Sequence, residues 1–179
     1  MSARRADERE LLLGEWACLG ILAQAPAHGF AVAARLKPEG DIGRVWSLSR
    51  ALTYRALDHL REQGLIEQVG EEPGIAGGSR TVLGPTRSGT ALLRKWYGTP
   101  VVHLRDLRSE LLLKLVLAEQ SGADVGTLVE RQQDVIRDLT KRVEHQRDER
   151  EELDVVALWR LEAADAADRF LQRVRQRRA

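Results

Sequence analysis

The stretch SLSRALTYRALDHLREQGLIEQV, residues 47–69, carries the signals of a helix and of a strand that follows it at once. Ser47 or Ser49 can cap the start of the helix, because a serine hydroxyl accepts a hydrogen bond from the backbone of the first turn. Gly64 is placed to end the helix in the left-handed conformation. The last five residues of the stretch, LIEQV, predict a short strand.

A second strand is expected shortly after the first. Residues 71–79 contain one proline and three glycines, which is the composition of a turn. Residues 80–83, RTVL, then predict the returning strand of a hairpin. A helix followed directly by a glycine-tipped hairpin is typical of a winged DNA-binding domain, in which the hairpin is the wing.

The segments on either side complete this pattern. Upstream, apolar residues recur at helical spacing over about 8–25, where Pro26 ends the helix, and a second helix is expected over 29–36. Downstream, Thr86 can cap a fourth helix that ends near Gly98. The sequence therefore predicts a mainly α fold with a small β wing, the winged helix-turn-helix.

The helix that follows Ser49 has two different faces. At 100° per residue, one face collects four apolar side chains: Leu52, Ala56, Leu57 and Leu60. That face is expected to pack against the other helices, and the opposite face can enter a major groove. Residues near the start of such a helix usually reach the base edges. The predicted DNA-binding residues are Ser49, Arg50, Thr53, Tyr54 and Arg55, together with Arg80 at the root of the wing.

The second half of the chain predicts long amphipathic helices. One helix is expected over about 104–119, and Asp124 can cap the next. Residues of that next helix recur in alternating steps of three and four, a seam of coiled-coil type: Val125, Leu128, Gln132, Val135, Leu139, Val143 and Gln146. A last helix from about Leu153 has an apolar face that reaches Val174. These helices predict packing against a second copy of the chain. The expected domains are thus a winged helix over 1–98 and a helical dimerisation domain over 99–179.

In these motifs the chain resembles the PadR-like family of transcriptional regulators over nearly its full length. The matching pieces are His28-Gly29-Phe30, Leu48 to Leu60, Gln63-Gly64-Leu65-Ile66, Arg80 with Thr86 and Gly89, and Arg105 to Leu115. The last piece and the helical tail resemble the virulence-regulator branch of the family. The resemblance implies a homodimer that represses promoters by binding a palindromic operator in double-stranded DNA. It also implies release of the DNA when a small molecule binds.

One departure from the family pattern concerns the reading helix. Where the family tends to have a small polar residue, then leucine, then tyrosine, this chain has Leu52-Thr53-Tyr54. Thr53 therefore occupies the position of an expected core leucine. The departure bears on the rotation of the helix about its own axis, and hence on which side chains face DNA.

Charge does not by itself indicate a nucleic-acid partner. The chain has 28 Lys and Arg against 27 Asp and Glu, so no overall basic field exists. Glu71 and Glu72 would also place acidic side chains on the wing. An alternative therefore stays open, namely a protein-interaction module on a winged helix scaffold that does not bind DNA.

Other features bear on location and on catalysis. The single cysteine, Cys18, fits a reducing cytoplasm, and no apolar run is long enough for a membrane span. The four histidines stand far apart without cysteine neighbours, so no metal site is expected. The glycine-rich segment near Gly74 lacks the lysine of a phosphate-binding loop. We therefore expect a cytoplasmic protein that is not an enzyme and uses no cofactor.

The tryptophans have two readings. Trp16, Trp96 and Trp159 fit a packed core, because large aromatic side chains are mostly buried. They could instead line a site for a small aromatic or hydrophobic effector at the dimer interface. The sequence leaves both interpretations open.

Overall fold

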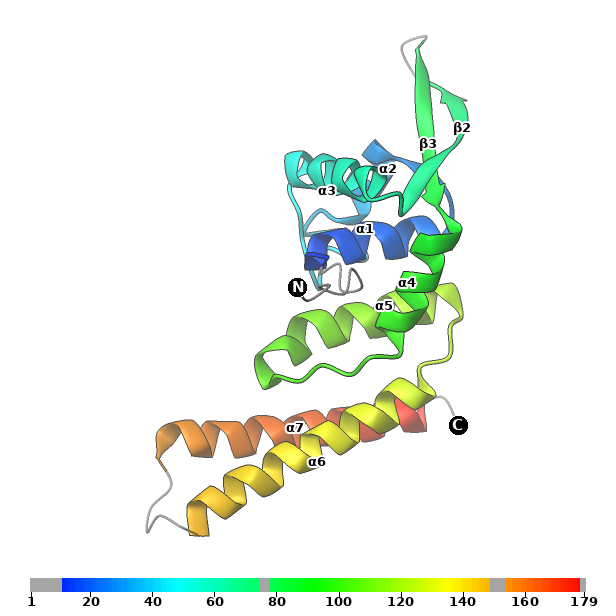
Figure 1. The fold of residues 1–179 in the computed structure, drawn as a ribbon. Coiled ribbons are helices and arrows are strands. Elements are labelled where there is room, and N and C mark those ends of the chain that lie inside the picture. The colour runs from blue at the N-terminus through cyan, green and yellow to red at the C-terminus, as the bar shows by residue number, and fades with distance from the viewer. Residues whose placement is uncertain (1–10, 75–77, 149–153, 178–179) are drawn as a thin grey trace, which may run out of the picture. The chain divides into compact units, whose positions relative to one another are not determined.

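The computed structural model describes residues 11–74, 78–148 and 154–177, and it divides into two compact units (Figure 1). The first unit is Met1–Leu93 and the second is Arg94–Ala179.

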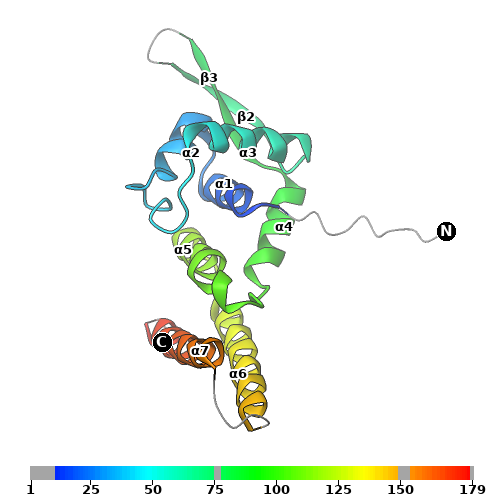
Figure 2. The ribbon, with the colours of Figure 1, turned by 90° about the vertical axis from the view of Figure 1, so that its left-hand side faces the viewer.

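The first unit combines helices with a small sheet. Its helices are α1 (Leu13–Gln24), α2 (Gly29–Arg35), α3 (Arg50–Glu62) and most of α4 (Arg87–Tyr97). Strands β1 (Ala27–His28), β2 (Ile66–Pro73) and β3 (Ser79–Pro85) form one antiparallel sheet in the order β1-β3-β2. The β2–β3 hairpin extends beyond the helices as a wing (Figure 2). The predicted fold class, a winged helix followed by a helical region, is confirmed.

The local signals in residues 47–69 form the predicted elements. Ser49 caps α3 by accepting a hydrogen bond from the Leu52 amide, 3.3 Å away. Gly64 adopts φ +66°, the left-handed conformation that ends the helix. Thr86 likewise caps α4, because its hydroxyl accepts a hydrogen bond from the amide of Gly89.

The packed face of α3 differs from the prediction by one residue. Thr53 is completely buried, and its hydroxyl donates to the Ser49 carbonyl at 3.0 Å, which satisfies the polar group inside the core. Leu52, expected in the core, is 46% exposed, so that expectation was wrong. Thr53 therefore packs inward at the position where the family pattern has a core leucine, and Leu52 beside it is exposed.

Helix α1 is the buried centre of the first unit. Glu15 on this helix is only 5% exposed, and its carboxylate accepts from the Leu12 amide and contacts His59 Nδ1 of α3 at 2.6 Å. Cys18 is fully buried, and burial, with a smaller contribution from Glu15, raises the pKa of its thiol to about 12. The thiol therefore stays protonated at neutral pH and serves as packing.

The second unit is helical throughout. A 3₁₀ turn (Leu104–Asp106) and a π turn (Leu107–Leu111) lead into α5 (Leu112–Ser121), so the helix expected over 104–119 begins with irregular turns. Gly122 then ends α5, and the Asp124 carboxylate accepts from the Gly126 amide at the start of α6, as predicted.

Helices α6 (Gly126–Asp148) and α7 (Val155–Gln176) pack side by side as an antiparallel hairpin (Figures 1 and 2). Residues of the apolar seam of α6 take part in this packing within the same chain. Val125, Leu128 and Ile136 are buried in one cluster with Ala164 and Leu171 of α7. Val125 and Leu128 of the predicted seam are thus covered within the same chain, beside Ile136, which was not part of it; packing of the seam against a second copy stays a prediction.

Candidate nucleic-acid interface

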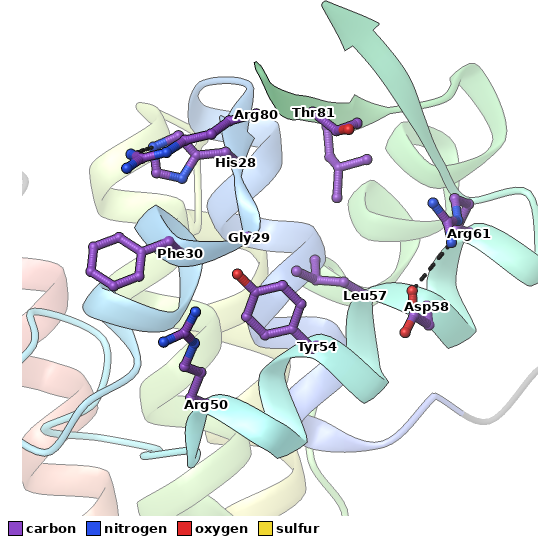
Figure 3. A pocket seen from close by; sticks show the side chains of 11 residues that line it. His28, Gly29, Phe30, Arg50, Tyr54, Leu57, Asp58, Arg61, Arg80 and Thr81 are labelled. Atoms are coloured by element: carbon purple, nitrogen blue, oxygen red, sulfur yellow. Dashed lines mark hydrogen bonds and ion pairs between the residues drawn. The ribbon is translucent and has the colours of Figure 1, made fainter. Parts of the chain in front are cut away.

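A hollow of about 440 Å³ lies in the first unit where α2, α3 and the wing meet (Figure 3). The start of α2 supplies His28, Gly29 and Phe30. Helix α3 supplies Arg50, Tyr54, Leu57, Asp58 and Arg61, and strand β3 supplies Arg80, Thr81 and Leu83. Three arginines from two different elements thus border one hollow that contains a single carboxylate among its described lining residues.

Arg50 is held between two aromatic rings. Its guanidinium carbon lies 5.6 Å from the centre of the Phe30 ring and 5.7 Å from that of Tyr54. Both distances fall within the range of cation–π attraction, which orients the planar guanidinium without using its hydrogen-bond donors. The donors of Arg50 are thereby presented at the rim of the hollow (Figure 3).

Gly29 permits the close approach of α2 to α3. A Cβ atom at position 29 would lie 2.9 Å from a ring carbon of Tyr54, which is closer than carbon atoms normally approach. The glycine therefore lets Tyr54 stand against the α2 backbone, with its hydroxyl toward the hollow (Figure 3). This contact explains why a glycine stands between His28 and Phe30 in the sequence motif.

His28 joins α2 to the wing. Its Nδ1 accepts a hydrogen bond from the Ala31 amide at 3.1 Å, so a neutral imidazole carries its proton on Nε2. Nε2 lies 3.9 Å from the Glu72 carboxylate and 3.4 Å from a terminal nitrogen of Arg80. With Nε2 protonated, the approach of Arg80 is a packing contact, and the Arg80 donors stay available.

The acidic residues are partly engaged within this surface. Asp58 pairs with Arg61 on α3 at 3.3 Å. On the wing, Glu72 lies opposite Arg80 in the strand register, and Glu71 accepts from the Ser79 hydroxyl at 2.8 Å. Glu71 therefore has a hydrogen-bond partner within the hairpin, and Glu72 stands across the strand register from a cationic residue, which reduces the repulsion that these two side chains would exert on a polyanion.

The six residues predicted to bind DNA fall into three groups in the structure: some border the hollow, some are exposed outside it, and one is buried. Arg50, Tyr54 and Arg80 border the hollow. Ser49 and Arg55 are exposed outside it, with the Ser49 hydroxyl used as the helix cap. Thr53 is completely buried, so it is not available to contact DNA in this conformation.

Sequence reasoning overlooked residues that complete the hollow. Phe30 and His28 were noticed as a motif without a role, although an aromatic residue directly after the motif glycine was a usable signal. Arg61 lies three turns along α3 from Arg50, and helical periodicity places both on the polar face of the helix, but Arg61 was not named among the predicted DNA-binding residues.

The tryptophans named as effector residues have separate environments. Trp16 of α1 is half-buried in the first unit. In the second unit, Trp96 is buried and its indole N–H donates to the Glu110 carboxylate at 3.2 Å, whereas Trp159 of α7 is 70% exposed. Trp96 thus has a structural partner, and Trp159 stands on the surface.

Within residues 11–74, 78–148 and 154–177, no three His, Cys, Asp or Glu side chains gather closely enough to hold a metal ion. No helix in the described part of the chain is long and apolar enough to cross a membrane.

Comparison with known proteins gives similarity to solved structures. No protein-family model matches the chain, and no curated protein matches it. One similar structure is PadR of Bacillus subtilis in complex with operator DNA, at 16% identity, with 90% of this chain and 97% of that chain covered and a TM-score of 0.46. Others are the virulence activator AphA of Vibrio cholerae (21% identity, 92% of each chain, TM-score 0.42) and the PadR-like transcriptional regulator BC1756 from Bacillus cereus (17% identity, 98% and 99%, TM-score 0.42). PadR-like regulators, which the sequence motifs resemble, are thus among the structures similar to this chain.

Proposed function

We propose that this protein is a sequence-specific DNA-binding transcriptional regulator that acts as a homodimeric repressor. The observation that carries the proposal is the hollow bordered by Arg50, Arg61 and Arg80, because it combines donors from the reading helix with a donor from the wing. Residues 1–98 bind the operator and residues 99–179 dimerise. A small-molecule effector releases the DNA.

The proposal assigns base readout and phosphate contact to different residues of the hollow. Arg50 and Tyr54 lie in the first turns of α3, the part of a reading helix that usually reaches base edges. Arg80 lies on the wing, and its guanidinium suits a phosphate oxygen at the edge of the same groove. The near-neutral charge of the whole chain is compatible with this role, since Arg50, Arg61 and Arg80 border one hollow.

Dimerisation is proposed through the outer face of α7. Its apolar residues Val156, Trp159, Ala163, Ala166 and Phe170 recur in steps of three and four, and Val156, Trp159 and Phe170 are 52%, 70% and 38% exposed. This periodicity is that of a helix–helix seam. Two copies that pair through it would bring two winged helices to a two-fold symmetric operator.

Arg50→Ala should lose sequence preference more than general affinity. An arginine contact to a guanine edge contributes about 1–3 kcal/mol of discrimination. Duplexes selected from a random library by the wild-type protein supply the operator. Fluorescence anisotropy then compares the variant and the wild type on the selected duplex and on a scrambled duplex of equal length.

Arg169→Ala on α7 is the matched control, because Arg169 is an exposed arginine outside the proposed interface. Equal affinity of Arg50→Ala and the wild type on both duplexes would overturn the readout assignment. Failure of the wild type to select any duplex would instead favour the protein-interaction module.

Arg80→Ala should weaken the selected and the scrambled duplex about equally. A lost phosphate contact should also make the slope of log affinity against log salt shallower by about one unit, because fewer counterions are released on binding. Titrations at several salt concentrations measure this slope. An unchanged slope would show that Arg80 does not contact the DNA backbone.

A further inference from the structure

Asp58 and Arg61 form an ion pair on α3, at the end of the hollow that is farther from Arg50 (Figure 3). Arg61 Nη2 donates to Asp58 Oδ1 at 3.3 Å. The side chains of Asp58 and Arg61 are 64% and 60% exposed, so the pair stands open to solvent. Exposed ion pairs contribute little to stability, and the fold therefore depends little on this one.

The position of Asp58 is unfavourable for general binding of DNA. It is the single carboxylate among the described lining residues of a hollow that three arginines border. A carboxylate repels phosphate oxygens, so Asp58 weakens binding to every duplex alike. It can favour binding only where it meets a hydrogen-bond donor of the duplex. In the major groove these donors are the N4 amino group of cytosine and the N6 amino group of adenine.

The ion pair leaves hydrogen-bonding groups free on both partners. Within the described part of the chain, Asp58 Oδ2 has no hydrogen-bond partner, and neither have Nε and Nη1 of Arg61. The pair thus presents free donors beside a free acceptor, and Asp58 orients the planar guanidinium.

A C·G base pair shows the complementary arrangement in the major groove. O6 and N7 of guanine are two adjacent acceptors, and the N4 amino group of cytosine is a donor beside them. In an A·T pair the amino group lies between the two acceptors, N7 of adenine and O4 of thymine, so an arginine cannot bind both side by side.

We propose that Asp58 and Arg61 together read one C·G base pair: Arg61 donates to O6 and N7 of the guanine, and Asp58 accepts from N4 of the cytosine. This inference rests on the proposed function. Asp58 lies slightly more than two turns along α3 from Arg50, or roughly 12 Å, which spans roughly three base pairs at 3.4 Å each. The C·G pair is therefore distinct from the guanine assigned to Arg50.

The test selects duplexes from a random library with the full-length wild type and with Asp58→Ala and Arg61→Ala, and then sequences them. Both variants should lose about tenfold of the preference for the same C·G pair and keep the preference that depends on Arg50. Asp58→Ala should bind a scrambled duplex at least as tightly as the wild type, because a charge that repels phosphates is removed. The double variant should lose less preference than the sum of the single losses, since the two side chains act as a unit.

A modified base isolates the arginine contact. The guanine of that pair is replaced by 7-deazaguanine, in which a C–H group stands in place of N7. Fluorescence anisotropy should show binding of the wild type weakened by about fivefold, and binding of Arg61→Ala unchanged.

Glu62→Ala is the matched control, because Glu62 is an exposed carboxylate of the same helix outside the hollow. The substitution removes the same charge and should leave every base preference unchanged. Circular dichroism checks that the variants fold. Unaltered base preferences in both Asp58→Ala and Arg61→Ala, or an equal effect of 7-deazaguanine on the wild type and Arg61→Ala, would overturn the reading pair.

The reading pair and the proposed function fail in different ways. A wild type that selects a duplex, with a preference lost in Arg50→Ala but in neither Asp58→Ala nor Arg61→Ala, would overturn the reading pair alone. A wild type that selects no duplex would overturn the proposed function and the reading pair with it.

Discussion

Ala166→Asp together with Phe170→Asp should leave the chain folded and weaken operator binding by about a hundredfold or more. Both residues lie on the outer face of α7 and already contact solvent, so aspartate at these positions adds no buried charge to a single chain. In a dimer paired through this face, four carboxylates would be brought together in an apolar interface. The dimer should therefore dissociate.

The size of the effect follows from avidity. A single winged helix makes few phosphate contacts and should bind close to the non-specific range of roughly 10⁻⁴–10⁻⁶ M. Linking two such modules raises the overall affinity by about 10²–10⁴-fold, because the second binds at a high effective concentration. Analytical ultracentrifugation and operator titration on the same samples measure the association and the affinity together.

Leu158→Asp is the matched control. Leu158 is 49% exposed on α7, and at 100° per residue it lies well away from the face formed by Trp159, Ala166 and Phe170. The Leu158→Asp substitution introduces a carboxylate into the same helix and should leave both the dimer and the affinity for the operator unchanged. A double variant that remains dimeric and binds its operator as tightly as the wild type would show that α7 is not the dimerisation surface.

The choice of these two positions depends on the structure. Periodicity in the last helix groups Leu171 with Ala164, Ala167 and Val174 on one apolar face, but it does not say whether that face packs on the same chain or on a second copy. In the structure Leu171 is completely buried against α6, whereas Phe170 faces outward. Aspartate at Leu171 would unfold the hairpin and could not test dimerisation.

Local signals made the elements predictable. Caps such as Ser49 and Thr86, the left-handed Gly64 and the proline and glycines of the wing each act within a few residues of their own position. Such signals are readable from a single sequence because their partners are neighbours in the chain. They were sufficient for the order of the helices and of the two hairpin strands, and for the winged helix, but not for the short strand β1.

Partners far apart in the sequence were not predictable in the same way. The α6 seam had the periodicity of a helix pair, but periodicity does not say whether the other helix belongs to the same chain. The Phe30–Arg50–Tyr54 contact requires the packing of α2 on α3, which only the fold supplies. Thr53 is a related case, because a hydroxyl in the core is recognisable only once its acceptor, the Ser49 carbonyl, is known.

Lys114 is the clearest long-range arrangement that the sequence did not indicate. Its side chain is 1% exposed, and its ammonium donates to Glu110 Oε1 and to the Thr99 carbonyl, each at 2.7 Å. The same ammonium lies 5.0 Å from the centre of the Trp96 ring, and Glu110 also accepts from the Trp96 indole. One buried lysine thus holds α5 to the segment that follows α4.

Lys114→Met should destabilise the protein by about 3–5 kcal/mol, the usual cost of removing one partner of a buried ion pair. Methionine retains much of the apolar stem but leaves the Thr99 carbonyl without the ammonium donor and the Glu110 carboxylate without its cation, with the Trp96 indole as its remaining donor. Urea unfolding at one protein concentration measures the change. Lys141→Met, at an exposed position of α6, is the control and should change stability by less than about 0.5 kcal/mol.

The pH dependence gives a second readout of the same residue. Burial lowers the pKa of Lys114 below its ordinary value of 10.5, and Glu110 opposes this shift only in part. The unfolded chain therefore binds more protons than the folded chain in the alkaline range below 10.5, so this lysine makes the free energy of unfolding rise with pH there. Lys114→Met lacks this contribution, and the stability difference between the wild type and the variant should widen as the pH rises toward 10.5. A loss in Lys114→Met no larger than that in Lys141→Met, with no change of the difference across this pH range, would show that the buried ammonium does not hold the second unit together.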